Sequence, residues 1–208
     1  MGNDAYALNN GSYGLTTLLS RHARISGDRL SLNFRGKSGK AHLIQVRDRK
    51  LATVVKRCRS IAGARLFQYR DAHGRQHHVT AQDVNRYLHE ATGRPFTAKE
   101  FRTWQGTLQA ALYLASCERG ASRASAKRAI KAAIELTCAQ LGNTATICRK
   151  SYIHPAVLDA FLDGSLGREL PIELARARRN APVGLRPQEW AVLVWLERRT
   201  QRVLAKCA

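Results

Sequence analysis

Residues 29–47 read RLSLNFRGKSGKAHLIQVR, and this stretch decides the kind of fold that the chain can adopt. Apolar side chains alternate with polar ones at Leu30, Leu32 and Phe34, and a second apolar run extends from His42 to Val46. A glycine-bearing segment separates the two runs. Because alternation around a short glycine turn is typical of a β-hairpin, we expect two antiparallel strands over residues 29–47.

Helical patterns dominate the chain after this hairpin. The sequence at Thr80, and again at Thr97, resembles a capping box, with an acidic residue three positions later and apolar residues at helical spacing beyond it. Further apolar stripes predict helices over residues 122–141, 156–162 and 187–207. We therefore expect a mainly α-helical protein with a small antiparallel β-sheet near its N-terminus.

A polar, arginine-rich connection covers residues 164–186, where glycine and proline recur. This composition favours a flexible linker. We expect a core over residues 1–163, and a separate region over residues 164–208 that consists of this connection and a last helix.

The charge of the chain indicates its partner. Among 208 residues, 35 Lys and Arg stand against 15 Asp and Glu, which gives a formal net charge of +20. Such an excess attracts a polyanion through release of counterions, so nucleic acid is the expected partner. A basic ribosomal or histone-like protein would carry a similar charge, and the activity therefore stays open at this point.

Cysteine spacing and hydropathy indicate the compartment. The five cysteines are scattered, with no close pair that would form a zinc site or a disulfide framework. No apolar run reaches membrane-spanning length, and residues 1–10 lack the pattern of a signal peptide. We expect a cytoplasmic, nucleoid-associated protein without membrane contact, metal, nucleotide or other cofactor.

Three segments carry the residues that matter for chemistry. They are FRGKSGKAH at 34–42, FTAKEFRTW at 96–104, and LGNTATICRKSY at 141–152, which is followed by Ile153-His154-Pro155. In this order and at this spacing they resemble the catalytic region of type IB DNA topoisomerases, especially the compact poxvirus-like and bacterial forms. The resemblance covers roughly residues 1–160. It implies the catalytic fold that these enzymes share with tyrosine recombinases, so that the core over residues 1–163 is catalytic.

The resemblance also implies an activity. Members of the family cut one strand of duplex DNA through a 3′-phosphotyrosyl intermediate, let the strand swivel, and reseal it without ATP or metal; we expect this chain to act so as a monomer. Tyr152 matches the nucleophile, since a phenol can form a phosphodiester that the freed hydroxyl later reverses. Arg102 matches a clamp, because a guanidinium can contact two phosphate oxygens as negative charge builds on them.

Lys37 and Asn143 complete the expected catalytic set. Lys37 matches the general acid that protonates the departing 5′ oxygen, with Lys40 as its nearest rival. Asn143 stands where many members have a histidine that hydrogen-bonds a phosphate oxygen, and its amide can donate the same bond. Capping of the next helix, after Gly142, is the competing account of Asn143. The residues expected to contact DNA are Arg35, Lys40, Arg149 and Lys150.

One catalytic arginine of the family has no counterpart in this sequence. The family pattern places it just before a Gly-Asn…Tyr segment, which here is Gly2-Asn3-Asp4-Ala5-Tyr6, with Met1 in the adjoining place. The small N-terminal DNA-gripping domain of the family is missing too. We therefore expect these 208 residues to act as a C-terminal catalytic fragment that binds duplex DNA and cleaves it slowly.

Two other classes of protein stay open. A tyrosine recombinase or integrase catalytic domain uses the same chemistry, but such enzymes usually have a histidine where this chain has Lys99, and the run Arg102-Thr103-Trp104 favours the topoisomerase. A noncatalytic DNA-binding fragment would fit the absent arginine and the high positive charge.

Overall fold

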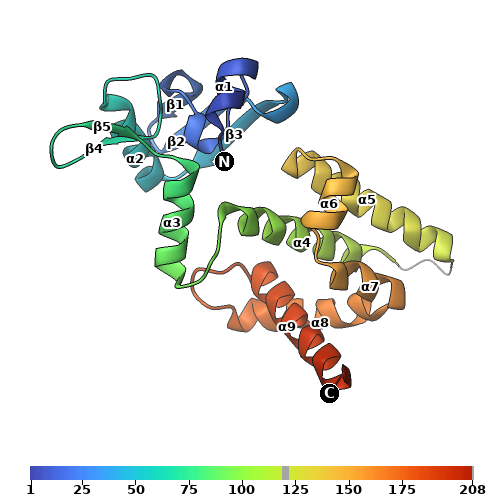
Figure 1. The fold of residues 1–208 in the computed structure, drawn as a ribbon. Coiled ribbons are helices and arrows are strands. Elements are labelled where there is room, and N and C mark those ends of the chain that lie inside the picture. Colours follow the sequence, from blue (N-terminus) through green and yellow to red (C-terminus); the bar gives the residue numbers. More distant parts are fainter. Residues whose placement is uncertain (119–121, 208) are drawn as a thin grey trace. The chain divides into compact units, whose positions relative to one another are not determined.

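A computed structural model describes residues 1–118 and 122–207 of the chain (Figure 1). The chain forms two compact units, Met1–Ala98 and Lys99–Ala208. The helices and strands of the first unit are α1 (Asp4–Asn10), β1 (Ala23–Ser26), β2 (Arg29–Arg35), β3 (Ala41–Arg47), α2 (Arg49–Ser60), β4 (Gln68–Arg70), β5 (Gln76–His78) and α3 (Ala81–Thr92). The helices that build the second unit are α4 (Ala98–Ser116), α5 (Arg123–Leu141), α6 (Ala145–Ser151), α7 (Pro155–Asp163), α8 (Ser165–Asn180) and α9 (Pro187–Cys207).

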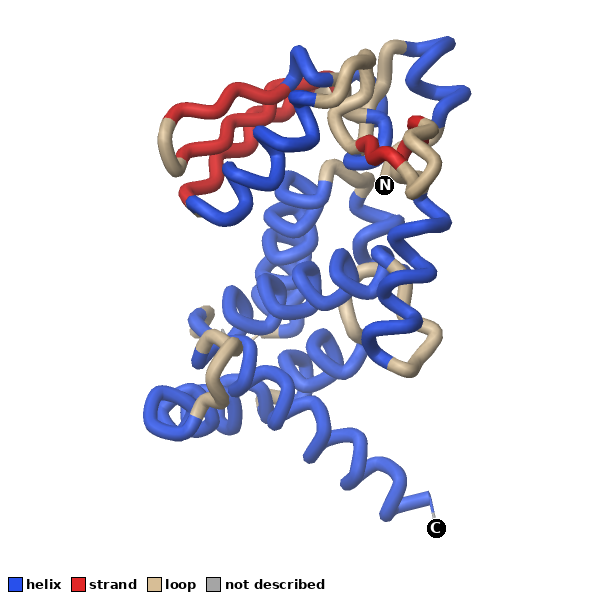
Figure 2. Tube along the Cα trace, turned by 90° about the vertical axis from the view of Figure 1, so that its left-hand side faces the viewer, coloured by secondary structure: helices blue, strands red, loops and turns tan. Residues whose placement is uncertain are grey.

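The expected hairpin over residues 29–47 is confirmed as strands β2 and β3. They pair antiparallel, with Leu32 opposite Ile44 and Phe34 opposite His42, and β1 adds a third strand on the other side of β2. Helix α2 lies along this sheet (Figure 2). Leu30 and Leu32 of β2 are buried in a small core with Val55 of α2, so the alternation in β2 gives one apolar face for the helix to cover.

Helix α3 is capped by Thr80, where the sequence predicted a capping box. The Thr80 hydroxyl accepts the backbone N–H of Asp83, and the Asp83 carboxylate accepts the backbone N–H of Thr80, which is a capping box. Gly93 ends the helix in the left-handed conformation, with φ of 63°. A turn over residues 71–74 joins β4 to β5.

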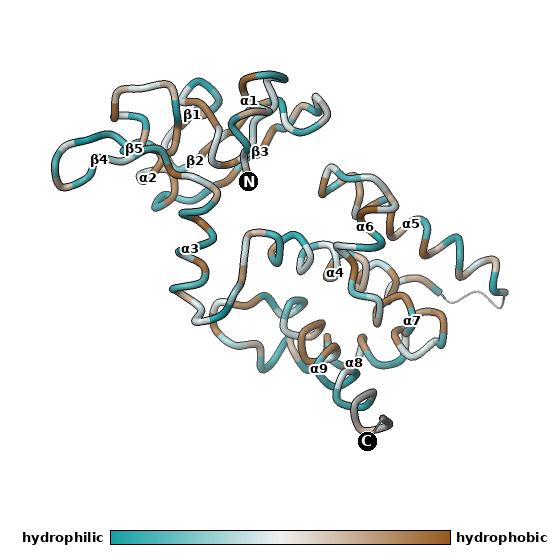
Figure 3. Tube along the Cα trace, in the orientation of Figure 1, coloured by the Kyte–Doolittle hydropathy of each residue, from teal (hydrophilic) through white to brown (hydrophobic). Residues whose placement is uncertain are grey.

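The second unit is built from helices around one hydrophobic core. Its buried side chains come from α4, α5, α6, α7, α8 and α9, including Leu114, Ile134, Cys148, Phe161, Leu166 and Trp195. Figure 3 shows the hydrophobic stretch of α7 in brown, in contrast to the hydrophilic loop between β4 and β5 of the first unit. The mainly helical fold with a small N-terminal sheet is therefore confirmed.

The prediction of a flexible linker over residues 164–186 was wrong. Residues 165–180 form helix α8, which packs along α9. Leu166 and Leu170 have no exposed surface and Trp195 of α9 is 2% exposed, so these helices share the core with α4, α5 and α7. The division of the chain accordingly falls at residues 98 and 99 and not at residues 163 and 164. Apolar residues spaced for one helix face were present in this arginine-rich stretch, and they outweigh its Gly and Pro content.

Candidate active site

Arg102 and Tyr152 come together in the second unit, although 50 residues separate them in the sequence. Arg102 lies near the start of α4, and Tyr152 directly follows α6. The central carbon of the guanidinium lies 5.3 Å from the centroid of the tyrosine ring. Both side chains are half-buried, so a large substrate can still reach them.

Among the described residues, no carboxylate neutralises the positive charge of Arg102. Its guanidinium donates one hydrogen bond, 2.5 Å long, to the carbonyl oxygen of Leu141 at the end of α5. Within the described ranges, no carboxylate lies within ion-pair distance of Arg102. The surface ion pair that would be the ordinary role of such an arginine is therefore not formed, and its remaining N–H groups are free for an anion.

Asn143 lies two residues beyond Leu141, in the connection between α5 and α6. Gly142 ends α5 with φ of 68°, and Thr144 caps α6 by accepting the N–H of Ile147. The capping account of Asn143 is thus wrong, because the neighbouring Thr144 does the capping. The amide nitrogen Nδ2 of Asn143 is buried and has no hydrogen-bond partner among the described residues. A buried donor without a partner is costly, and a bound phosphate oxygen would satisfy it.

The backbone around Tyr152 is held by the side of α4 that faces it. The Thr103 hydroxyl lies 3.3 Å from the carbonyl oxygen of Ser151, and the Thr107 hydroxyl 3.5 Å from that of Tyr152. Thr107 also accepts the N–H of His154 at 3.0 Å. These contacts bind the turn on both sides of the tyrosine.

Gly106 permits this close approach. A Cβ atom at position 106 would lie 2.4 Å from the carbonyl oxygen of Tyr152, well inside van der Waals contact. The sequence patterns indicated no part for Thr103, Gly106 or Thr107 in holding the backbone around Tyr152. The signal that could have found them is a glycine inside a helical pattern, which often marks close packing of another backbone segment.

Arg149 and Lys150, which we expected to contact DNA, form part of the last turn of α6, just before the tyrosine. Both side chains are exposed, and among the described residues neither has an ion-pair partner. Their positive charge is therefore available to a nucleic acid, and that role stays a prediction.

Lys37, the expected general acid, lies in the first unit on the short 3-10 helix Lys37–Gly39 that joins β2 to β3. Gly36 is required before it, since a Cβ there would lie 2.6 Å from the ring of His42. His42 in turn stacks on Phe34, with ring centroids 5.1 Å apart. The stacking of these two rings stabilises the turn that carries the exposed Lys37 side chain.

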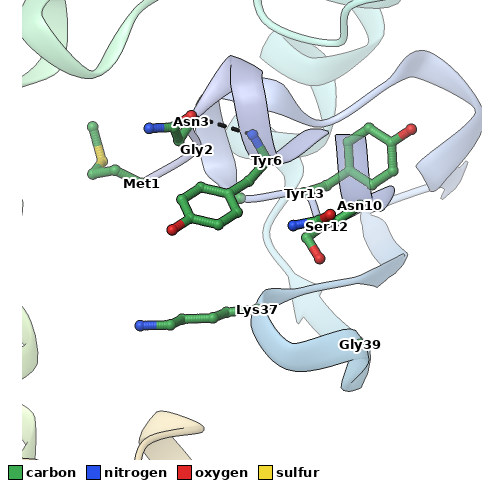
Figure 4. A pocket seen from close by; sticks show the side chains of 10 residues that line it. Met1, Gly2, Asn3, Tyr6, Asn10, Ser12, Tyr13, Lys37 and Gly39 are labelled. Carbon is green, nitrogen blue, oxygen red and sulfur yellow. Dashed lines mark hydrogen bonds between the residues drawn. The ribbon is translucent and has the colours of Figure 1, made fainter. Parts of the chain in front are cut away.

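A cavity of about 480 Å³ in the first unit is lined by Lys37. Figure 4 shows the Lys37 side chain and the Tyr6 phenol extending on the same side of it. Asn3 caps α1 by accepting the N–H of Tyr6, and Gly2 donates to the hydroxyl of Thr16 at 3.1 Å. The segment 2–6 is thereby fixed next to the lysine. Arg35 and Lys40, at the two ends of the turn, are exposed.

The comparison with known proteins decides the family. Residues 1–167 match the family model described as the catalytic core of eukaryotic DNA topoisomerase I. The chain belongs to this family. It is also similar to the protein named DNA topoisomerase 1B of Acanthamoeba polyphaga mimivirus, with 33% identity over 168 residues. That match covers 77% of this chain and 50% of the relative, so the chain spans about half the length of the relative that it matches.

Membership of the topoisomerase I family is consistent with the fold that the resemblance implied, which is a helical catalytic core with a small sheet. The roles of Tyr152, Arg102, Asn143 and Lys37 stay predictions. Tyr152, Arg102 and Asn143 belong to the second unit, and Lys37 belongs to the first.

The described residues hold neither a cluster of metal ligands nor a membrane-spanning helix. No group of three or more His, Cys, Asp and Glu side chains in residues 1–118 and 122–207 is arranged to hold a metal ion. In the same ranges, no helix combines the length and the apolar character needed to cross a bilayer.

Proposed function

We propose that this chain is the catalytic part of a type IB DNA topoisomerase, with duplex DNA as its substrate. In this proposal Tyr152 cuts one strand, the strand rotates about its intact partner, and the cut is resealed. Membership of the topoisomerase I family supports the activity, as does the similarity to the viral protein named DNA topoisomerase 1B. The net charge of +20 supports DNA as the partner.

The reaction exchanges one phosphodiester for another. The phenol oxygen of Tyr152 attacks the phosphorus, the phenol proton passes to solvent, and the bond between phosphorus and the 5′ oxygen breaks. The ammonium group of Lys37 gives a proton to that leaving oxygen. The products are a 3′-phosphotyrosyl bond and a free 5′-hydroxyl, and the same steps in reverse reseal the strand. Because the bond energy is retained, neither ATP nor a metal ion is consumed.

Arg102 and Asn143 stabilise the transition state in this proposal. As the phosphorus becomes pentacoordinate, negative charge grows on its non-bridging oxygens, where fixed donors have the largest effect. The observation that carries the proposal is that the guanidinium carbon of Arg102 lies 5.3 Å from the centroid of the Tyr152 ring. No carboxylate of the described residues forms an ion pair with this guanidinium. The unpaired Nδ2 of Asn143 in the adjoining turn supports a second donor.

We further propose that residues 1–208 by themselves cleave slowly. The family's other catalytic arginine would adjoin Gly2-Asn3, and Met1 stands in that place. Loss of one preorganised donor of this kind commonly raises the barrier by about 2.7–4 kcal/mol. Relaxation by these 208 residues at the rate of an intact family member would contradict this part of the proposal.

Relaxation of a supercoiled plasmid, with EDTA and without ATP, tests the proposed function. We expect slow relaxation by the wild type and a covalent protein–DNA adduct when the reaction is stopped with detergent. Tyr152→Phe should give neither product, because it lacks the attacking oxygen. EDTA should leave the wild-type rate unchanged.

Tyr87→Phe is the matched control, since Tyr87 is an exposed tyrosine of α3 and carries no assigned role. It should form the adduct like the wild type. An adduct that persists in Tyr152→Phe would show that another residue attacks the DNA. Binding without any adduct in the wild type would favour the noncatalytic DNA-binding fragment.

A further inference from the structure

Helix α2 carries a concentration of positive charge for which the proposed reaction has no use. Its twelve residues include five Lys and Arg and no Asp or Glu. We call Arg49, Lys50, Lys56 and Arg57 the α2 basic face; all four side chains are exposed.

The α2 basic face lies outside the part of the helix that packs on the sheet, since all four of its side chains are exposed. Ala52 and Val55, on the inner side, are 2% and 1% exposed. Arg49 and Lys56 are seven residues apart, as are Lys50 and Arg57, so each pair lies on nearly the same side of the helix, two turns apart. Two turns span about 10.5 Å, close to the axial rise of about three successive phosphates in one DNA strand.

The carboxylates that the structure describes do not neutralise the α2 basic face. In the part of the chain that the structure describes, no member of the α2 basic face has an ion-pair partner. Asp48 stands just before the helix, but its carboxylate accepts the N–H of Leu51 as the N-cap. Elsewhere in the same unit, Arg47 pairs with Asp28 at 2.7 Å and Arg86 with Asp83 at 2.5 Å.

The position of two of these cations opposes helix stability. Arg49 and Lys50 lie in the first turn of α2, which has no acidic residue. The helix dipole makes that end partly positive, so cations there are unfavourable and carboxylates would be favoured. A helix shaped only for stability would not carry this arrangement, whereas a helix that binds an anion gains from both the dipole and the side chains.

We propose that the α2 basic face binds the phosphate backbone of duplex DNA without reading its sequence, as a contact separate from the phosphate that Tyr152 attacks. This inference rests on the proposed function for its partner, duplex DNA. Exposed point charges spaced along one helix suit a regular row of phosphates, and no carboxylate of the described residues pairs with them.

The salt dependence of DNA binding tests this inference. The full chain is compared with a variant in which all four residues become Gln, each protein also carrying Tyr152→Phe so that no covalent adduct forms. Binding to a fluorescent duplex is measured by anisotropy at several salt concentrations. A plot of the logarithm of the binding constant against the logarithm of salt concentration falls less steeply by about 0.9 for each lost phosphate contact. For four lost contacts we expect the absolute slope to decrease by about 3.6. The variant's melting temperature should not fall, because two cations leave the positive end of the helix.

The matched control replaces four ion-paired arginines by Gln, namely Arg47, Arg75, Arg86 and Arg186. It removes the same charge from sites where a carboxylate already neutralises it, so the slope should change by less than about 1. A slope of the α2 variant equal to that of the wild type, or to that of the control, would overturn the inference.

The result of this DNA-binding test can be distinguished from the result of the test of the proposed reaction. With Tyr152 restored, the α2 variant should still form the covalent adduct at low salt. If the slope does not change while the adduct forms, α2 is not a DNA contact and the proposed reaction stands. If the slope changes as expected while no adduct ever forms, the DNA contact stands and the proposed reaction fails.

Discussion

Arg102 is available for a substrate because of what surrounds it. Its one hydrogen bond goes to a backbone carbonyl, which orients the guanidinium and leaves its charge in place. The tyrosine ring lies against the guanidinium, so the two groups hold each other's position. At the residue scale, the Leu141 carbonyl and the Tyr152 ring orient the guanidinium without neutralising its charge, so Arg102 can still bind an anion.

Arg102→Ala should slow formation of the covalent adduct by about a hundredfold to a thousandfold, the usual loss for one preorganised donor. Arg102→Lys should recover little of this rate, because an ammonium cannot contact two oxygens as the planar guanidinium does. Single-turnover cleavage of an oligonucleotide duplex measures both. Arg86→Ala, which removes an arginine already paired with Asp83, should keep the wild-type rate. Equal rates for Arg102→Ala and the wild type would remove Arg102 from the site.

His22 should make the first unit less stable in mild acid. Burial lowers the pKa of His22 below its ordinary value, and the neighbouring Arg21 lowers it further. Its Nδ1 accepts the N–H of Leu19, which requires the neutral ring. The unfolded chain therefore binds a proton at His22 more readily than the folded chain does. The contribution of neutral His22 to the free energy of unfolding is complete above about pH 6.5 and is lost as the pH falls below that value. Denaturant unfolding at pH 8 and pH 5 should show this decline in the wild type, and a smaller decline in His22→Gln.

At the element scale, the position of Tyr152 depends on how closely α4 approaches the turn after α6. Gly106→Ala should push that turn away, because the added Cβ would lie 2.4 Å from the carbonyl oxygen of Tyr152. We expect a loss of about 1–3 kcal/mol in stability together with a large loss of adduct formation. Thermal unfolding and the cleavage assay measure the two effects.

Gly167→Ala is the control for this substitution, since Gly167 is also helical and a Cβ there would meet nothing within 4 Å. It should keep the cleavage rate and stabilise the protein by up to about 1 kcal/mol. A Gly106→Ala protein that cleaves as fast as Gly167→Ala would show that the close contact does not position the tyrosine.

Sequence patterns predicted several elements with strong local signals, but they missed α8, whose Gly and Pro content hid its helical spacing, and elements with weak signals. The hairpin of β2 and β3 and the capped helix α3 have alternation or capping residues that act over a few positions. Strand β1 has four residues, and α1 has seven, of which Ala7 alone is buried. Their stability comes from neighbours distant in sequence, and local periodicity does not record that. The resemblance named Tyr152 and Arg102, whereas Gly106 and Thr107 act through contacts that only the fold creates.

At the scale of the whole molecule, α8 and α9 belong to the same unit as the tyrosine. Arg199 of α9 pairs with Asp163 at the end of α7, with atoms 2.7 Å apart, and donates to Ser165. Trp195 donates to Glu169 while most of its ring is buried. The last two helices therefore complete the core over which α7 and the tyrosine turn are built.

Truncation after residue 163 should therefore disrupt the second unit. The shortened chain loses the buried side chains of Leu166, Leu170 and Trp195, each worth about 1.5–3 kcal/mol. We expect binding of a hydrophobic dye, reduced helix content in circular dichroism, and no adduct. A truncated chain that unfolds cooperatively and keeps its helix content would instead support a separable last region.

The hydroxyl contacts of α4 act on the main chain on both sides of Tyr152, and this has a mechanical consequence under the proposed function. While the free 5′-hydroxyl end of the DNA rotates about the intact strand, the 3′ end bonded to the phenol has to stay in place for resealing. A displacement of that end would have to move the Cα of Tyr152, which Thr103 and Thr107 tie to a helix of nineteen residues. The attached phosphorus therefore stays where the returning 5′ oxygen can attack it.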